Sequence, residues 1–180
     1  MPALPDQFSL VLQATAFAAR AHRHQIRKDA RTPYVSHPFR VCMILRELLG
    51  VADPECLATA LLHDTIEDTT TDYDDIREAF GPNVARWVAL LTKDKRMEED
   101  AREEAYFATL AQSEWQVHLC KLADIADNLY DSDSLSPLDR RRYLMRSRQC
   151  LLRMNESLQP EARHAFNIVL RLLEEREALG

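Results

Sequence analysis

Glycine is scarce in this 180-residue sequence, which has only Gly50, Gly81 and Gly180. Runs in which valine or isoleucine alternates with polar residues are also few, whereas Ala, Leu, Glu and Arg are abundant. A sheet-rich fold needs the alternating pattern, and the abundant residues are good helix formers. The sequence therefore predicts an all-α fold. Its length is most simply that of one domain, which would bury roughly 70% of the unfolded surface.

The sequence also lacks an excess of basic residues and any long apolar run. The net charge is −6, which gives no reason to expect binding to a nucleic-acid backbone. No stretch approaches the ~20 apolar residues that cross a bilayer. Asp6 and Gln7 interrupt the early apolar residues, so we expect no signal peptide. We therefore expect neither nucleic acid nor a membrane as a partner.

Paired cysteine motifs are absent, because the four cysteines lie far apart and none forms a CxxC pair. They are Cys42, Cys56, Cys120 and Cys150. All four have apolar neighbours, which is typical of buried free thiols. Free thiols suit a reducing compartment, so the sequence predicts a cytoplasmic location.

Helix-capping patterns divide the chain into helices. Gly50 can end one helix in the left-handed conformation, and the segment 53–55, Asp-Pro-Glu, can begin the next. Ser136 followed by proline is a similar beginning. The predicted helices lie near 7–24, 38–49, 54–67, 72–80, 82–92, 98–112, 114–130, 137–158 and 160–177.

The segment ALLHDTIEDTT, residues 60–70, places ionisable side chains directly after an apolar run. Residues four apart share a helix face, so a helix that runs through 67 would set His63 beside Glu67 and Asp64 beside Asp68. Carboxylates this close repel each other, and a cation or a shared proton would relieve the repulsion. The alternative is a solvated helix end with an incidental histidine. The preceding leucine pair and the two further acids weaken that alternative.

Two other segments offer metal ligands. In TPYVSHPF, residues 32–39, His37 lies where a helix should begin. In KLADIADNL, residues 121–129, Asp124 follows an apolar pair and Asn128 lies one turn later. An aspartate in a buried helix is unusual unless it is paired or bound to a metal. The alternatives are a histidine that packs at a helix start and a satisfied core aspartate.

Together these segments supply two imidazole nitrogens and two carboxylates. The four residues are His37, His63, Asp64 and Asp124. This donor set suits Mn, Fe or Mg better than a structural zinc ion, and it would leave open positions for water and substrate oxygens.

The same ordered set resembles that of the HD phosphohydrolase superfamily. Several longer stretches resemble, in order and spacing, the hydrolase domain of RelA/SpoT homologues. They are AHRHQIRKDARTPYVSHPFRV (21–41), ATALLHDTIEDTTT (58–71), FGPNVARWVALLT (80–92) and KLADIADNL. In length the chain resembles a stand-alone small alarmone hydrolase. The resemblance implies one HD hydrolase domain over residues 1–180, a helical bundle with its motifs in 7–131 and further helices in 137–177.

The resemblance also implies a role for each matched residue. One Mn²⁺ ion would be held by His37, His63, Asp64 and Asp124. Glu67 and Asp68 would position or deprotonate the attacking water. Arg27 and Lys28 would pack on and hold the nucleotide base, and Asn128 would lie near the ribose.

The activity that the resemblance implies is removal of the 3′-pyrophosphate from ppGpp or pppGpp, which leaves GDP or GTP. The substrate would then be a guanosine or adenosine polyphosphate. One alternative is an HD phosphohydrolase that acts on another phosphorylated nucleotide or an NADPH-like cofactor. Another is a metal-dependent nucleotide sensor without turnover. A homo-oligomer is compatible with the sequence.

A polyanionic substrate needs basic partners in this acidic chain. The candidates for pyrophosphate contact are Lys95, Arg142 and Tyr143. The sequence departs from the family pattern at Ile125 and Asp127, where related hydrolases often carry a basic and a neutral residue. This departure keeps the ligands, and it leaves open the choice between guanine and adenine.

Overall fold

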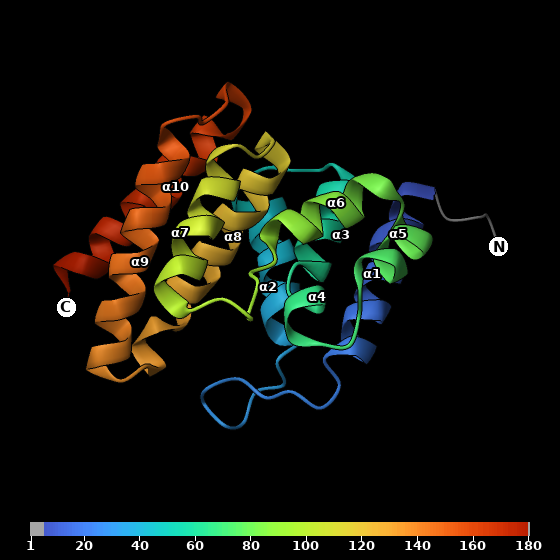
Figure 1. Ribbon diagram of the computed structural model, residues 1–180, viewed down its shortest axis with the longest axis horizontal. Coiled ribbons are helices and arrows are strands. Elements are labelled where there is room, and N and C mark those ends of the chain that lie inside the picture. Colours follow the sequence, from blue (N-terminus) through green and yellow to red (C-terminus); the bar gives the residue numbers. More distant parts are fainter. Residues whose placement is uncertain (1–5, 180) are drawn as a thin grey trace.

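The computed structural model describes residues 6–179, which fold into helices without a strand (Figure 1). The α-helices are α1 (Asp6–Ala21), α2 (Ser36–Met43), α3 (Pro54–Leu62), α4 (Thr65–Asp68), α5 (Tyr73–Phe80), α6 (Pro82–Leu91), α7 (Glu99–Ala111), α8 (Trp115–Asp131), α9 (Pro137–Asn155) and α10 (Pro160–Ala178). A π-helical turn, Ile44–Leu48, extends α2, and a 3₁₀ turn, Ser132–Ser134, follows α8. The predicted all-α bundle is confirmed. No helix within 6–179 has the length and apolarity to cross a membrane.

Helices α3 and α8 form the centre of the bundle. In Figure 1, α1, α5 and α6 lie to one side, and α7, α9 and α10 lie to the other. Every residue of α3 from Cys56 to Leu62 is buried, as are eleven residues of α8. Helices that are apolar on most sides must lie inside a protein. The ends and faces of these two helices therefore place polar residues deep in the molecule.

Several predicted helix boundaries have the expected capping contacts. Gly50 has φ of +74° at the end of the π-helical turn. The Asp53 carboxylate accepts a hydrogen bond of 2.8 Å from the Cys56 backbone N–H. The Ser136 hydroxyl accepts one of 3.2 Å from Asp139. Each contact satisfies a backbone group that the helix itself leaves unpaired.

The prediction of one continuous helix over 54–67 is wrong. Helix α3 ends at Leu62 and the short α4 begins at Thr65. His63 Nδ1 lies 2.9 Å from the Ala60 carbonyl oxygen, and the Thr65 hydroxyl donates to the Leu62 carbonyl at 2.6 Å. These side chains take over carbonyls that a continuing helix would bond through its backbone, which explains the break. The His-Asp pair therefore occupies a turn and not a helix face.

The prediction of free cysteine thiols is confirmed. Cys56, Cys120 and Cys150 are buried, and Cys42 is half-buried. Burial raises the pKa of the Cys42 thiol to about 11, which keeps it protonated near neutral pH.

Candidate active site

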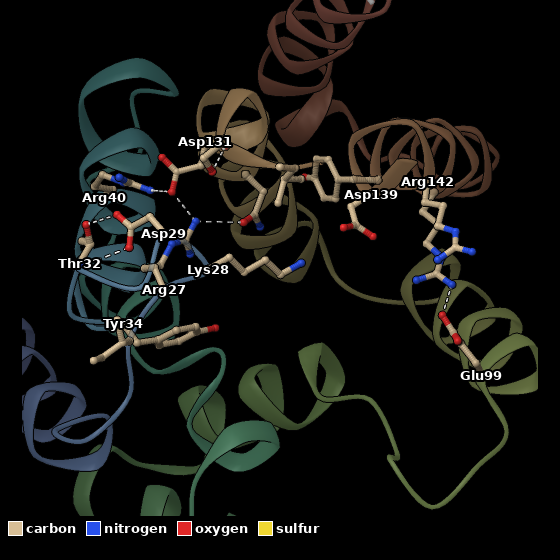
Figure 2. A pocket seen from close by; sticks show the side chains of 16 residues that line it. Arg27, Lys28, Asp29, Thr32, Tyr34, Arg40, Glu99, Asp131, Asp139 and Arg142 are labelled. Atoms are coloured by element: carbon tan, nitrogen blue, oxygen red, sulfur yellow. Dashed lines mark hydrogen bonds and ion pairs between the residues drawn. The ribbon is translucent and has the colours of Figure 1, made fainter. Parts of the chain in front are cut away.

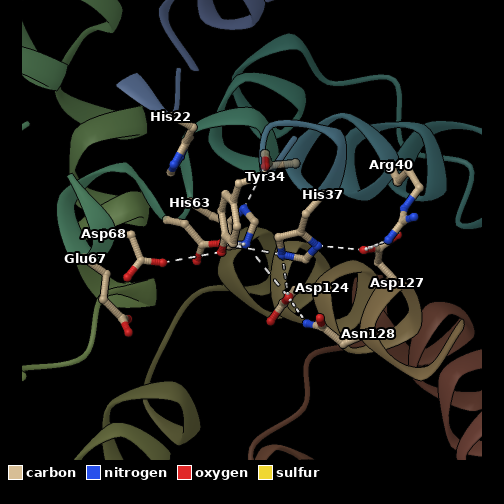
Figure 3. A network of polar contacts seen from close by, with 12 residues as sticks. His22, Tyr34, His37, Arg40, His63, Glu67, Asp68, Asp124, Asp127 and Asn128 are labelled. Atoms are coloured by element: carbon tan, nitrogen blue, oxygen red, sulfur yellow. Dashed lines mark hydrogen bonds and ion pairs between the residues drawn. The ribbon is translucent and has the colours of Figure 1, made fainter. Parts of the chain in front are cut away.

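Four side chains from three segments meet beside the buried end of α3. His37 Nε2 lies 3.2 Å from Asp124 Oδ1 and 3.5 Å from Asp64 Oδ2. His63 Nε2 lies 3.1 Å from the same Asp64 oxygen and 3.8 Å from Asp124 Oδ1. The donor atoms of His37, His63 and Asp124 all lie within 4.8 Å of one another, which is a spacing that a metal ion can bridge. Figure 3 shows both imidazoles turned toward Asp124.

Hydrogen bonds fix the tautomer of both histidines. His37 Nδ1 lies 2.6 Å from Asp127 Oδ2, and His63 Nδ1 lies 2.9 Å from the Ala60 carbonyl oxygen. Carboxylates and carbonyls only accept, so in the neutral imidazoles each Nδ1 carries the proton and each Nε2 presents a lone pair. The buried Nε2 of His63 has no hydrogen-bond partner. An orphaned buried nitrogen that faces two carboxylates fits a divalent metal ion.

The electrostatic field of this cluster favours a cation. Burial by itself would lower the pKa of His37, but hydrogen bonds to Asp124 and Asp127 outweigh it and raise the pKa to about 9. Burial would raise the pKa of Asp124, but the Lys121 charge and the two imidazoles hold that pKa well below its usual range. The cluster therefore favours positive charge, which protons or a metal ion that competes with them can supply.

Neighbouring side chains orient the two carboxylates. The Lys121 ammonium donates to Asp124 Oδ2 at 2.7 Å, and the Asn128 amide donates to Asp124 Oδ1 at 2.6 Å. The Tyr34 hydroxyl donates to Asp64 Oδ2 at 2.5 Å. The sequence pattern did not predict these roles, although Tyr34 lies in the motif 32–39 and Lys121 in the motif 121–129.

Glu67 and Asp68 lie on α4, to one side of the histidines (Figure 3). Glu67 Oε2 accepts a hydrogen bond of 2.9 Å from the Lys93 backbone N–H. Burial is the main reason that the pKa of Glu67 lies above its usual range, and the nearby carboxylates of Asp64 and Asp68 add to it. Asp68 accepts a hydrogen bond from the Lys95 ammonium. Both acids face the same cavity as the histidines.

Two cavities that share part of their lining lie at this cluster, and we call the one that contains the cluster the inner cavity. The inner cavity, of about 250 Å³, is lined by the histidines, Asp64, Asp124 and the α4 acids. The outer cavity, of about 550 Å³, has sixteen lining residues, of which five are basic and four acidic. Three residues line both, namely Tyr34, Asn128 and Tyr143. The outer volume is within the usual range for a small-molecule site.

The outer cavity contains most of the residues that were predicted to bind substrate. Its lining includes Arg27, Lys28, Asn128, Arg142 and Tyr143. Figure 2 shows Arg27 and Lys28 on one side of the cavity and Arg142 on the other. Lys95 lines neither cavity and pairs instead with Asp68.

Two further residues of this region were missed in the sequence as site residues. Asp127, treated there only as a departure, is 1% exposed and bonds both His37 and Arg40. Arg40 lines the outer cavity and also bonds Asp131. Asp127 had a detectable signal, because it is an acid inside a predicted buried helix, the argument that identified Asp124.

A family model described as HD domain matches residues 14–149. The chain belongs to the HD domain family. It is 41% identical over 128 residues to human guanosine-3′,5′-bis(diphosphate) 3′-pyrophosphohydrolase MESH1, which covers 71% of this chain and 72% of the human protein. It is 36% identical over 143 residues to the bifunctional (p)ppGpp synthase/hydrolase SpoT of Escherichia coli, which covers 76% of this chain and 20% of SpoT.

A solved structure agrees with this HD-domain assignment. It is described as a metazoan ortholog of SpoT that hydrolyzes ppGpp, and it matches 94% of this chain and 97% of its own with a TM-score of 0.80 and 30% identity. The expected resemblance to RelA/SpoT-type HD hydrolases is thereby confirmed.

Proposed function

We propose that this HD-domain chain hydrolyses guanosine 3′,5′-bis(diphosphate) and the corresponding pentaphosphate, releasing the 3′-pyrophosphate to leave GDP or GTP. The observation that carries the proposal is the pair of imidazoles whose Nε2 atoms face two carboxylates, in a cavity that shares three lining residues with a nucleotide-sized cavity containing five basic side chains. The activities printed for the human and Escherichia coli relatives support it.

The divalent ion in this proposal is Mn²⁺. Its ligands would be His37, His63, Asp64 and Asp124. A set of two nitrogens and two hard oxygens suits this ion. When bound, such an ion acts as a Lewis acid toward phosphate oxygens and lowers the pKa of water.

Glu67 and Asp68 are the proposed catalytic acids of α4. A general base works best when its pKa is near the working pH, and burial moves the pKa of Glu67 in that direction. The Lys93 N–H holds one Glu67 oxygen, which directs the carboxylate into the inner cavity. Glu67 would take the proton of the attacking water. Asp68, tethered by Lys95 and 3.4 Å from the Tyr34 hydroxyl, would position that water.

The outer cavity would hold the nucleoside and its phosphates. Arg27 and Lys28 would pack on the base, and Asn128, which lines both cavities, would contact the ribose. Arg142 and Tyr143 would contact phosphate oxygens from the opposite side. Lys95 would contact pyrophosphate only after it leaves Asp68, so it is the weakest member of this set.

The test is an incubation of the purified protein with ppGpp and Mn²⁺, followed by chromatographic separation of the nucleotides. We expect GDP and pyrophosphate in equal amounts, and neither product in a chelator-treated control. Absence of both products at saturating Mn²⁺ would refute the proposal. A parallel series with ppApp and with NADPH separates the substrates, because the true one should have the highest kcat/KM.

The cellular setting of this activity is part of the same proposal. We place the protein in the cytoplasm, as a single HD domain over residues 1–180 with a nucleotide as its partner. Fractionation of cells that express the tagged full chain tests the location. Light scattering of the purified protein tests whether it is a homo-oligomer.

A further inference from the structure

The carboxylate of Asp127 joins the two cavities through a set of hydrogen bonds that none of the proposed catalytic steps uses. Asp127 lies on α8, one turn beyond Asp124, and is 1% exposed. A buried carboxylate without partners is strongly disfavoured, so its partners determine what it does. Asp127 has two strong partners, a metal-site histidine on one side and an arginine of the outer cavity on the other.

On the first side, His37 Nδ1 donates to Asp127 Oδ2 at 2.6 Å. This contact turns the other ring nitrogen, Nε2, toward Asp64 and Asp124. A carboxylate behind a metal-binding histidine fixes its tautomer and ring orientation and makes the imidazole a stronger ligand. His63 has only a backbone carbonyl, that of Ala60, in the equivalent place. The two histidines therefore differ in the charge behind them.

On the second side, the Arg40 guanidinium binds Asp127 in a two-point contact, with Nε at 2.6 Å from Oδ1 and Nη2 at 3.0 Å from Oδ2. A bidentate arginine holds a carboxylate in one plane. Arg40 Nη2 also bonds Asp131, whose Oδ2 accepts from Arg27 Nη2 at 2.5 Å. The carboxylate that supports His37 is thus itself held by the arginines of the outer cavity.

These contacts form a closed circuit between two of the metal-site residues. Its members in order are His37, Asp127, Arg40, Asp131, Arg27, Asn128 and Asp124. Figure 3 shows the contacts of Asp127 with His37 and Arg40, and Figure 2 shows those of Asp131 with Arg40 and Arg27. Apart from the proposed ligand Asp124, the circuit has two acids: Asp127 touches a metal-site histidine, whereas Asp131 touches only arginines.

We infer that Asp127 is a positioning residue that raises the metal affinity of the site by holding the Nδ1–H of His37. The inference rests on the proposed metal site but not on the identity of the substrate. It predicts different effects on metal binding for the two acids of the circuit that are not proposed ligands. Loss of the Asp127 charge weakens metal binding, whereas loss of the Asp131 charge leaves metal binding nearly unchanged.

The experiment is a calorimetric titration of metal-free full-length protein with Mn²⁺ alone, in the absence of nucleotide. Asp127→Asn keeps the shape of the side chain but removes its charge and sets an NH₂ group against a donor. We expect it to lower Mn²⁺ affinity by about 10- to 100-fold. Asp131→Asn removes the same charge one turn further along the chain, and we expect a change below about threefold, because it is not bonded to a ligand and its field is screened.

A second readout distinguishes positioning from general support of the fold. The turnover of Asp127→Asn should recover toward the wild-type rate as the Mn²⁺ concentration is raised. The variant loses metal from the site, but it keeps all of the proposed catalytic groups. A loss of turnover that persists at saturating Mn²⁺ would overturn the inference, as would equal Mn²⁺ affinities for Asp127→Asn and the wild type. Equal losses in both variants would also overturn it, because they would indicate a shared effect on folding.

A third measurement needs no variant. In the wild-type protein loaded with diamagnetic Zn²⁺, long-range ¹H–¹⁵N spectra report which nitrogen of each histidine carries a proton. We expect His37 to be protonated at Nδ1 and metal-bound through Nε2. The opposite tautomer would overturn the inference. A wild-type protein that binds neither Mn²⁺ nor Zn²⁺ would refute the proposed metal-dependent function itself, whereas the outcomes above leave that function intact.

Discussion

The inner and outer cavities are built from different kinds of side chain. The lining of the inner cavity includes His37, His63 and Tyr34, and the side chain of each is bonded to a backbone carbonyl or to a carboxylate. The outer cavity is lined by five arginine or lysine side chains together with four acids, and Ile26 of its lining is 61% exposed. Short, bonded groups lose little conformational freedom when a ligand arrives, whereas long exposed ones lose much more. We therefore expect the inner cavity to be rigid before a ligand binds, whereas exposed side chains of the outer cavity, such as Lys28 and Arg142, can adapt to it.

The largest expected effect comes from removing an inner-cavity ligand. His63→Ala should abolish metal binding and lower kcat/KM for ppGpp by at least ~10³-fold, because the ion supplies several kcal/mol of charge stabilisation. Metal content by elemental analysis and turnover with Mn²⁺ should fall together. His164→Ala, an exposed histidine of α10, is the matched control. A His63→Ala protein with full metal content would contradict the site.

The next effect separates metal binding from proton transfer within the inner cavity. Glu67→Gln should keep the metal and lower kcat by about 10²- to 10⁴-fold, since general base catalysis is worth that much. Turnover and metal content are measured on the same preparation, with the exposed Glu78→Gln as control. Normal turnover in Glu67→Gln would remove this residue from the mechanism.

The outer cavity should respond differently, through KM more than kcat. Arg27→Ala should raise KM by about 2- to 30-fold, because a guanidinium packed on an aromatic base contributes roughly 0.5–2 kcal/mol of binding. Arg31→Ala removes an exposed arginine of the same loop that does not line the cavity, and it should be near neutral. A fall in kcat without a change in KM would mean that Arg27 acts in the reaction step and not in binding. The two cavities would then not differ in the way proposed.

The smallest effect is expected at the exposed side of the outer cavity. Arg142→Ala should raise KM only a few-fold at low salt, roughly the value of an exposed ion pair. The difference should shrink as salt is raised toward about 0.5 M, because exposed charges are screened. The neighbouring Arg141→Ala is the control, since Arg141 is exposed and does not line the cavity. A salt-independent loss would mean that Arg142 is buried against the substrate.

The same contrast explains which parts of the site could be predicted from sequence. His37, His63 and Asp124 are short side chains next to strong helix signals, and the structure brings their donor atoms together. The partners of long side chains depend on helix packing, which local spacing does not encode. Arg40 on α2 reaches Asp127 and Asp131 on α8, about ninety residues away, and no pattern near Arg40 indicates this.

Local side-chain bonding limited the prediction of the fold at one important place. The break between α3 and α4 depends on His63 and Thr65 bonding to the carbonyls of Ala60 and Leu62. Helix propensity and hydrophobic spacing favour continuation there, so the sequence predicted one helix over 54–67. By contrast, Asp53 and Ser136 carry capping signals that act within three residues, and those helix starts were predicted correctly.

Helix α8 supplies both Asp124 and Asp131, so the helix itself sets the distance between them. Seven residues at 1.5 Å per residue give about 10 Å along the axis. The helix thus holds the histidine cluster, at Asp124, and the pair Arg27 and Arg40, at Asp131, at a fixed separation. We expect a nucleotide whose reacting phosphate and base match this separation to contact both groups at once. A shorter or longer molecule would lose contacts with the histidine cluster or with the arginine pair.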